Sequence, residues 1–220
     1  MTARRAIYVA TGERHRREAA DSIRSLWQHH ADLPVTVHVD GEGGLGPEAL
    51  LDPPSPGRLE VLPHPSPTRS WADKPAALVV GGPTDERVLF LDTDTRVCGD
   101  LGEVFEVLAR FELAAVHAPV RLDRRQPDAL ARRAPVSFPE LNTGVVAFRR
   151  TPNVVRLFER WRHLHDQVRG TSGGAVGDQS TFRIALYESE VRFTVLPPEY
   201  NCRFPFPTYV HGPVRILHGR

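Results

Sequence analysis

Two aspartates follow directly on an apolar run in the stretch VLFLDTDTRV, residues 88–97. Asp92 and Asp94 are separated by a single threonine, so both carboxylates leave the predicted strand on roughly the same side once its pleat breaks. Two carboxylates placed in this way suit a hard divalent cation with oxygen ligands. The stretch therefore predicts a metal site for a phosphate-bearing ligand. The alternative is a solvated loop that happens to contain two acids.

The elements around this stretch predict where the two acids lie. Apolar and β-branched runs bounded by glycine and proline predict strands at 6–11, 34–40, 58–63, 87–94, 112–119, 143–150 and 191–197. Helical spacing predicts helices at 17–30, 70–80, 154–168 and 178–189, with Ser70 as the N-cap of the second. This alternation predicts an α/β fold with a mostly parallel central sheet flanked by helices. Such sheets bind ligands outside the carboxyl ends of their strands, where Asp92 and Asp94 would lie.

Length, charge and cysteine content exclude several classes of protein. A chain of 220 residues with 40% hydrophobic residues suits one α/β domain, which we expect to span residues 1–220. The formal net charge of +1 provides no overall field for nucleic acid or for an acidic membrane surface, so neither is an expected partner. Cys98 and Cys202 cannot form a disulfide framework, and no stretch reaches membrane-spanning length. The expected location is cytoplasmic.

Two other motifs compete for the interpretation of this chain. The strand that ends in DxDxT is similar to the nucleophile strand of haloacid-dehalogenase-type phosphatases, in which Asp92 would be the covalent nucleophile. That strand normally opens the chain, however, and no paired-acid motif follows here to complete a magnesium site. The stretch GEGGLG at 41–46 matches GxGxxG, but the following PEALL is broken by DPPSPG. Dinucleotide binding is therefore not expected.

Seven short motifs together resemble one family of enzymes. They are YVATG, WADKP, VLFLDTDTRV, LNTGVVAFRR, DQSTF, LPPEYNCRF and ILHG, and the resemblance extends from residue 6 to residue 219. In this order they resemble the glycogenin and lipopolysaccharide-galactosyltransferase type of nucleotide-sugar glycosyltransferase. The resemblance implies the GT-A fold, a Rossmann-like nucleotide-diphospho-sugar transferase fold. It also implies metal-dependent transfer of a hexose from a nucleotide diphosphate sugar, a UDP-sugar in the first instance, to a hydroxyl acceptor with retained anomeric configuration.

The resemblance implies a metal centre that includes the C-terminal histidine. Asp92 and Asp94 would hold Mn²⁺ or Mg²⁺, and His218 would be the third ligand. Because imidazole suits Mn²⁺ better than Mg²⁺, this third ligand would favour manganese. Thr93, between the acids, and Gly219, in the terminal ILHG motif, would contact the nucleotide sugar. The ion would bridge the two phosphates and neutralise the departing nucleoside diphosphate.

Other residues would bind the remaining parts of the donor. Thr11 and Gly12 would lie against the nucleotide base, because a glycine allows a close approach of the backbone, and His15 would pack near the base. Lys74, on the predicted helix at 70–80, would contact the phosphate or the sugar of the donor. Asn142 of the LNTG motif would bind sugar hydroxyls through its amide.

The DQSTF motif carries the residues that the resemblance places closest to the chemistry. Asp178 and Gln179 would bind the donor sugar and support catalysis, although an acid that follows a glycine loop could instead be only a helix N-cap. Arg215 or Arg220 would supply a further cation for the phosphates. Two other functions stay open: a magnesium-dependent phosphohydrolase that uses Asp92, and a nucleotide-sugar-binding protein without turnover.

Overall fold

The computed structural model describes residues 3–41, 58–64, 73–80, 83–84, 86–119, 132–171, 177–204, 206 and 208–219. Its helices are α1 (Glu13–His29), α3 (Asp73–Val79), α4 (Gly102–Val107), α6 (Pro152–Thr171), α7 (Asp178–Tyr187) and the 3-10 helix η1 (Pro198–Asn201). Its strands are β1 (Arg4–Ala10), β2 (Val35–Val39), β3 (Leu59–Pro63), β4 (Arg87–Leu91), β5 (Thr95–Val97), β6 (Leu113–His117), β7 (Leu141–Arg149), β8 (Phe193–Val195), β9 (Cys202–Arg203) and β10 (Ile216–His218).

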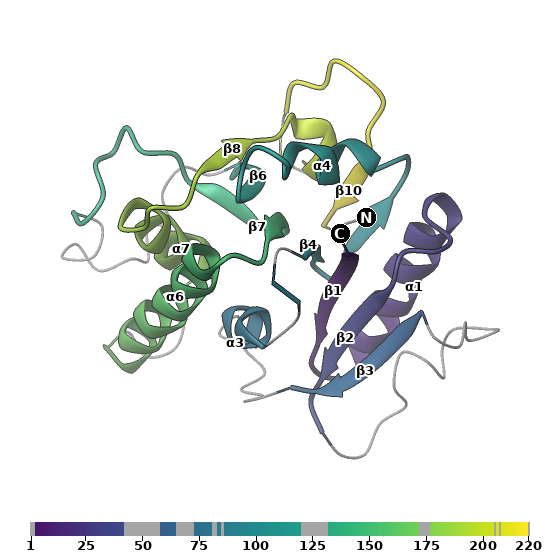
Figure 1. The fold of residues 1–220 in the computed structure, drawn as a ribbon, viewed down its shortest axis with the longest axis horizontal. Coiled ribbons are helices and arrows are strands. Elements are labelled where there is room, and N and C mark those ends of the chain that lie inside the picture. Colours follow the sequence, from purple (N-terminus) through teal and green to yellow (C-terminus); the bar gives the residue numbers. More distant parts are fainter. Residues whose placement is uncertain are drawn as a thin grey trace.

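Most strands form one seven-stranded sheet with the order β3-β2-β1-β4-β7-β6-β8. Neighbouring strands in it are parallel except on the two sides of β7, which runs antiparallel to both β4 and β6. The predicted α/β fold with a mostly parallel sheet and flanking helices is therefore confirmed (Figure 1). A second, three-stranded sheet has the order β5-β10-β9 and brings the C-terminal strand beside the residues that follow β4.

Alternation of side chains along the strands creates two hydrophobic cores, one on each face of the large sheet. On one face, Tyr8 and neighbouring strand residues pack against Ile23 and Leu26 of α1. On the other face, residues such as Phe90 pack with Trp161 of α6 and with the apolar residues of α3 and α7. In Figure 1, α1 lies on one side of the strands, and α3, α6 and α7 lie on the other. The sheet is therefore covered on both faces, as the near-continuous apolar runs predict.

Several boundaries differ from those that the sequence predicts. The strand that was expected to include both aspartates ends at Leu91, so that Asp92 and Asp94 lie in the turn before β5. Strand β7 begins at Leu141, before the predicted start at residue 143, because Leu141 still pairs with His117 across a bulge. The short elements β5 and α4 were not predicted, since they contain too few residues to show a hydrophobic period.

Some predictions concern residues outside the described ranges. These are the N-cap at Ser70, the glycine motif from residue 42 onward, and Arg220. Among the described residues, no helix combines the length and the apolar character needed to cross a bilayer.

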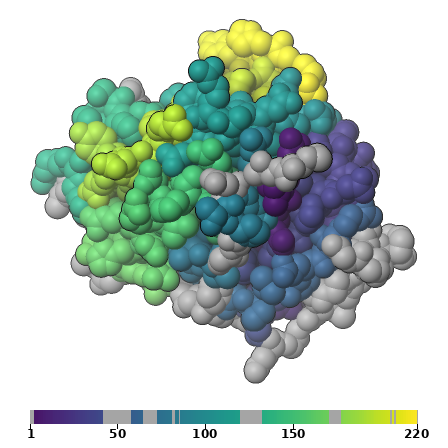
Figure 2. All heavy atoms as spheres, in the orientation of Figure 1, coloured from purple at the N-terminus to yellow at the C-terminus, as the bar shows by residue number. Residues whose placement is uncertain are grey.

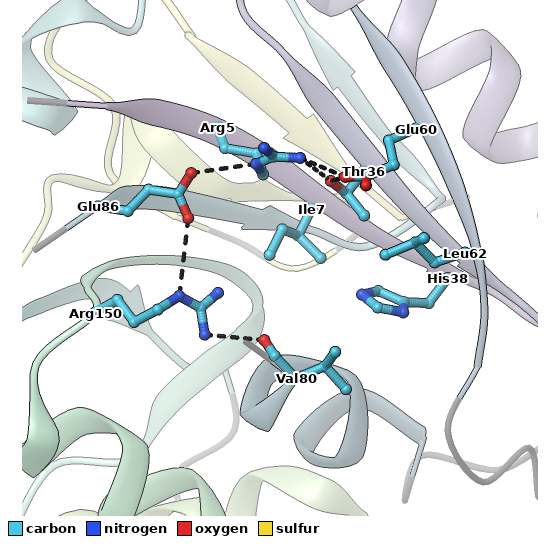
Figure 3. A pocket seen from close by; sticks show the side chains of 9 residues that line it. All are labelled: Arg5, Ile7, Thr36, His38, Glu60, Leu62, Val80, Glu86 and Arg150. Carbon is cyan, nitrogen blue, oxygen red and sulfur yellow. Dashed lines mark hydrogen bonds and ion pairs between the residues drawn. The ribbon is translucent and has the colours of Figure 1, made fainter. Parts of the chain in front are cut away.

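A polar cavity of about 170 Å³ lies near the amino ends of the parallel strands (Figure 3). Arg5 at the start of β1 pairs with Glu86 just before β4 and with Glu60 of β3, at 3.2 and 2.7 Å. Burial, together with the nearby His64, lowers the pKa of His38, which points into the cavity, to about 4, so this imidazole is neutral at physiological pH. The ion pairs link three strands at the edge of the sheet opposite to Asp92, which indicates a role in the fold.

One core residue connects packing to the start of a helix that carries predicted site residues. Trp161 is fully buried between Phe158 and Phe182, and its Nε1 donates a hydrogen bond to the carbonyl of Asp178 at 3.0 Å. The indole therefore fixes the first residue of α7 relative to α6.

We predict that Trp161→Ala lowers the free energy of unfolding by about 3–5 kcal/mol, because it leaves a large cavity. Trp161→Phe should cost about 1–2 kcal/mol, mainly through loss of the hydrogen bond to Asp178. Urea denaturation measures both changes. Arg162→Ala, at an exposed position on the same helix, is the control and should change stability by no more than about 0.5 kcal/mol. A Trp161→Phe variant as stable as the wild type would refute the role of the hydrogen bond.

Candidate functional site

The site lies at the point in the large sheet where the strand order reverses, between β1 and β4. β1 pairs in parallel with β2 on one side and with β4 on the other, so the loop after β1 and the turn after β4 lie next to each other. At such a point the loops after two neighbouring strands lead away in opposite directions. Open α/β sheets bind ligands in the crevice between these loops, outside the carboxyl ends of the strands. β7 runs in the reverse direction and therefore brings its amino end to the same edge. The backbone N–H of Asp92 donates to the carbonyl of Gly144 at 2.7 Å, which joins the two strands there.

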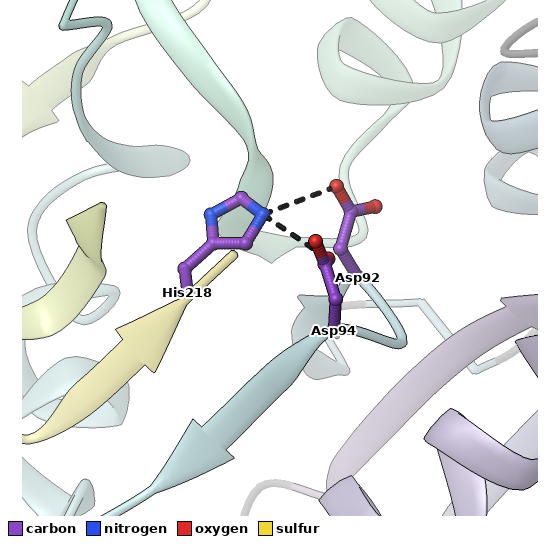
Figure 4. Close-up of side chains that lie close together, drawn as sticks. All are labelled: Asp92, Asp94 and His218. Atoms are coloured by element: carbon purple, nitrogen blue, oxygen red, sulfur yellow. Dashed lines mark ion pairs between the residues drawn. The ribbon is translucent and has the colours of Figure 1, made fainter. Parts of the chain in front are cut away.

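Asp92, Asp94 and His218 form one cluster at this edge (Figure 4). The Nε2 atom of His218 lies 3.5 Å from Oδ2 of Asp92 and 3.4 Å from Oδ1 of Asp94. One ligand atom from each residue lies within 4.8 Å of the others. His218 reaches the acids because β10 pairs antiparallel with β5, which places His218 opposite Thr95. Two carboxylates and one imidazole with this spacing can hold a divalent cation.

The hydrogen bonds of His218 orient its ring toward the carboxylates. Its Nδ1 lies 2.8 Å from Oδ1 of Asn201, so Nδ1 carries the proton and donates it to that oxygen. The lone pair of Nε2 is then directed toward Asp92 and Asp94. A hydrogen bond from the second nitrogen is the usual way in which proteins fix the tautomer of a metal-binding histidine.

Gly144 provides the room that this ring occupies. A Cβ atom at position 144 would lie 2.0 Å from Cε1 of His218 and 2.8 Å from Oδ2 of Asp92. No side chain larger than hydrogen fits there without displacing the imidazole, because real Cβ contacts are not so short. The imidazole and carboxylate donors, the oriented tautomer and the close fit at Gly144 together suit a metal ion.

Lys74 of α3 lies between two of the acids. Its Nζ is 2.9 Å from Oδ1 of Asp92 and 3.0 Å from Oδ2 of Asp178. Burial alone would raise the pKa of Asp92, but the charge of Lys74 outweighs it and holds that pKa well below its usual range. Burial likewise opposes the charge of Lys74, and the two carboxylates outweigh it and raise its pKa. Both groups are therefore charged throughout the physiological pH range.

The residues predicted to bind the sugar lie beside Lys74. Oγ1 of Thr143 donates to Oδ2 of Asp178 at 2.7 Å, and Nδ2 of Asn142 donates to Oε1 of Gln179 at 2.7 Å. The N-cap of α7 is Gly177, which has no side-chain capping bond, and Asp178 is the first helical residue. The alternative that Asp178 is only an N-cap is therefore wrong. Its carboxylate instead faces Lys74 and the amino end of β7.

The predicted base-binding residues form the loop after β1. Gly12 has φ +87°, which favours glycine, and its N–H donates to Oδ1 of Asp40 at 2.9 Å. The guanidinium of Arg16 also donates to Asp40, at 2.8 Å from the same oxygen. His15 is exposed and places its Nδ1 2.7 Å from the carbonyl of Thr11. The structure thus keeps Thr11, Gly12 and His15 together in one loop, held in place by Asp40 at the end of β2.

The remaining predicted residues frame the cluster of acids. Thr93 is buried, and its hydroxyl donates to Glu18 of α1 at 3.2 Å, so its side chain points toward α1. Gly219 has φ +101°, and its N–H donates to the carbonyl of Asp94 at 3.0 Å. The backbone on both sides of the acids is therefore fixed, by α1 and by the C-terminal segment. Figure 2 shows that segment, in yellow, gathered at the top of the molecule against residues from the middle of the chain.

Sequence reasoning missed four residues of this site. Gly144, Asn201 and Arg203 contact His218, and Asp40 holds the loop after β1. A glycine inside an otherwise apolar strand is a signal of close backbone approach, and it could have identified Gly144. The LPPEYNCRF motif contains Asn201 and Arg203, but nothing in its pattern shows which of its side chains face His218.

Comparison with known proteins identifies the fold. No protein-family model matches the sequence, and no curated protein matches it significantly. The galactosyltransferase LgtC, solved in complex with donor and acceptor sugar analogues, has a TM-score of 0.65 at 14% identity, covering 97% of this chain and 86% of LgtC. Mouse xyloside xylosyltransferase 1 has a TM-score of 0.62 at 16% identity, covering 99% of this chain and 98% of its own.

A third similar structure comes from Streptococcus pneumoniae. The glycosyltransferase GlyE of Streptococcus pneumoniae TIGR4, in its apo form, has a TM-score of 0.67 at 20% identity. The match covers 99% of this chain and 54% of GlyE, so this chain spans about half the length of that protein. At these identities the likeness is one of fold. The chain therefore has the GT-A fold of these glycosyltransferases.

Proposed function

We propose that this protein is a metal-dependent glycosyltransferase that moves a hexose from a nucleoside diphosphate sugar, in the first instance a UDP-sugar, to a hydroxyl acceptor. The observation that carries the proposal is the cluster of Asp92, Asp94 and His218 at the ligand-binding edge of the sheet, next to Lys74 and Asp178. The solved LgtC complex, with donor and acceptor sugar analogues, supports the same use of this fold.

Asp92, Asp94 and His218 would hold Mn²⁺ or Mg²⁺, and the mixed oxygen and nitrogen donor set favours Mn²⁺. When bound, the ion would neutralise the two phosphates of the donor and so make the nucleoside diphosphate a better leaving group. Lys74 would add a positive charge on the side of the sugar. Its amine already bridges Asp92 and Asp178, so it needs little movement to contact a donor phosphate.

Asp178 and Gln179 would act on the sugar itself. Both lie at the start of α7 and are fixed from β7, Asp178 by the hydroxyl of Thr143 and Gln179 by the amide of Asn142. Positive charge develops on the sugar ring as the glycosidic bond breaks, and a fixed carboxylate or amide oxygen beside the ring stabilises that charge. This arrangement supports transfer with retained configuration, in which the departing diphosphate assists on the same face. An active-site glutamine variant of LgtC has also been solved, and we propose Gln179 as the corresponding residue.

Thr11 and Gly12 would contact the base, because their loop follows β1 and adjoins the turn that carries Asp92. We assign His15 a position at the outer rim of the base site, since it is exposed.

The test of the proposal is a panel of nucleotide sugars, measured by thermal stabilisation with and without Mn²⁺. A selective rise in melting temperature that requires Mn²⁺ supports a glycosyltransferase, and hydrolysis or transfer of the bound sugar establishes turnover. Rapid hydrolysis of a phosphomonoester that is abolished in Asp92→Asn would instead establish the phosphohydrolase alternative. Binding without any turnover would identify a nucleotide-sugar-binding protein.

We predict that Asp92→Asn and Asp94→Asn each weaken Mn²⁺-dependent binding of UDP by at least about tenfold. Loss of a residue that only hydrogen-bonds to a metal ligand already costs about tenfold in metal affinity, and loss of a ligand should cost at least as much. Isothermal titration calorimetry measures the change. Asp21→Asn, at an exposed carboxylate of α1, is the matched control and should bind like the wild type. Unchanged binding in both site variants would exclude a metal bridge between these acids and the donor.

Gly144→Ala should displace His218 and abolish the preference for Mn²⁺ over Mg²⁺ in UDP binding, because the added Cβ occupies the space of the imidazole. The overpacked side chain should also cost about 1–3 kcal/mol of stability. Gly212→Ala, where the nearest atom to a new Cβ is 4.0 Å away, is the control. A Gly144→Ala protein that retains both the metal preference and the wild-type stability would show that His218 does not need this space.

Asp178→Asn and Gln179→Ala should reduce kcat by at least about tenfold while they change the affinity for the donor much less, because interactions that strengthen in the transition state appear in kcat. Steady-state kinetics of transfer or donor hydrolysis measure both constants. NMR of the first product formed should show retained anomeric configuration. An inverted product would indicate that Asp178 acts as a general base, and equal losses in affinity and kcat would indicate that both residues only bind the sugar.

A further inference from the structure

The guanidinium of Arg203 lies against the nitrogen of His218 that would bind the metal ion. Nη1 of Arg203 is 2.6 Å from Nε2 of His218. Arg203 is the last residue of β9, which runs parallel to β10 with Arg203 opposite His218. The backbone N–H of Phe204 donates to the carbonyl of His218 at 2.9 Å. The backbone of Arg203 is therefore fixed beside His218, so its guanidinium can change position only by rotation of the side chain.

The contact between Arg203 and His218 cannot coexist with a metal ion on the same nitrogen. A guanidinium only donates hydrogen bonds, so its contact uses the lone pair of Nε2. The proton on Nδ1, donated to Asn201, leaves that lone pair as the single acceptor of the ring. A cation bound by His218, Asp92 and Asp94 requires the same lone pair. The guanidinium must therefore leave Nε2 when a metal ion binds.

Charge determines where the displaced guanidinium can go. The negative charge of the site exceeds its positive charge. Asp92, Asp94 and Asp178 are three carboxylates, whereas Lys74 contributes one ammonium group that Asp92 and Asp178 already share. A diphosphate adds two further negative charges and a divalent ion removes two, so the loaded site still favours another cation. A guanidinium offers a planar fork of donors that matches phosphate oxygens.

The other described arginines close to this strand are placed differently. Arg215 lies against Gly99, where a Cβ would be 2.9 Å from its Nη1, and its own N–H is bonded to the carbonyl of Glu199. Arg96 is exposed on β5, between two residues whose side chains are buried. Among the described residues, Arg203 is the arginine in hydrogen-bond contact with His218.

We infer that Arg203 has two positions: it occupies the metal-binding nitrogen of His218 in the metal-free protein, and it binds the donor diphosphate once metal and nucleotide are bound. The inference rests on the proposed function and assigns it a further phosphate-binding residue. In the first position Arg203 competes with the metal, and in the second it stabilises the negative charge that grows on the departing diphosphate.

The two positions predict opposite effects of one substitution. In Arg203→Ala, Mn²⁺ alone should bind more tightly, by roughly threefold or more, because no hydrogen bond has to be broken first. In the presence of saturating Mn²⁺, UDP should bind about 10- to 100-fold more weakly, the loss expected for one charged hydrogen-bonding group. Arg203→Lys keeps the charge without the fork and should give an intermediate affinity for UDP. Arg96→Ala, at an exposed position of β5, is the control and should match the wild type in both measurements.

Isothermal titration calorimetry with Mn²⁺ alone, and then with UDP in saturating Mn²⁺, gives both constants, and thermal unfolding verifies that each variant is folded. Tighter Mn²⁺ binding together with weaker UDP binding in Arg203→Ala supports both positions. Weaker Mn²⁺ binding would overturn the inference, because Arg203 would then only hold His218 in place, and unchanged UDP binding would overturn it as well. If the wild type binds Mn²⁺ but no nucleoside diphosphate, the proposed function fails together with the second position, a result distinct from failure in Arg203→Ala alone.

Discussion

A single ammonium group holds two carboxylates together at the ligand-binding edge. Asp92 follows β4 and Asp178 begins α7, and without the Nζ atom of Lys74 between them their charges would repel each other or one of them would bind a proton. Lys74 is itself fixed by α3, which packs against α6 and places Leu78 in the same buried cluster as Trp161. The ion cluster of Lys74, Asp92 and Asp178 therefore joins the end of β4 to the start of α7.

The reversed strand β7 makes this meeting possible. In an all-parallel sheet, the edge that receives the carboxyl end of β4 would receive only carboxyl ends, and the start of β7 would lie at the opposite edge. Because β7 is antiparallel, Asn142, Thr143 and Gly144 at its beginning lie beside Gln179, Asp178 and Asp92, respectively. The first two use side chains to hold Gln179 and Asp178, and the third provides empty space for His218. One end of one strand thus contacts both the cluster of Asp92, Asp94 and His218 and the start of α7.

The fold and the acids could be predicted from sequence because they depend on local patterns. The apolar run of β4 fixes where a buried strand must end, and the first polar residues after it, Asp92 and Asp94, must therefore lie at its carboxyl edge. The antiparallel direction of β7 could not be predicted in the same way, since strand direction depends on the path of the chain between strands. The mostly parallel sheet was predicted, but the feature that completes the site was not.

Residues that act through long-range contacts were hardest to predict. Asn201 and Arg203 meet His218 only because the very short strands β9 and β10 pair with each other, and strands of two or three residues show no hydrophobic period. The role of Asp178 as more than a helix cap likewise required the position of Lys74 and Thr143. Sequence spacing could place an acid at the helix start, but only the tertiary fold shows which way its carboxylate points.

The position of His218 in the chain has a consequence for biosynthesis. Translation proceeds from the amino end, so strands β1 to β4 and the DTD turn leave the ribosome long before His218 does. Until then β5 lacks its antiparallel partner β10, and the two carboxylates have no imidazole opposite them. A growing chain can therefore begin to assemble the large sheet from β1 to β4 before the cluster suited to a cation is completed. The cluster therefore depends on a contact between residues far apart in the sequence, and it forms only when β10 has paired with β5.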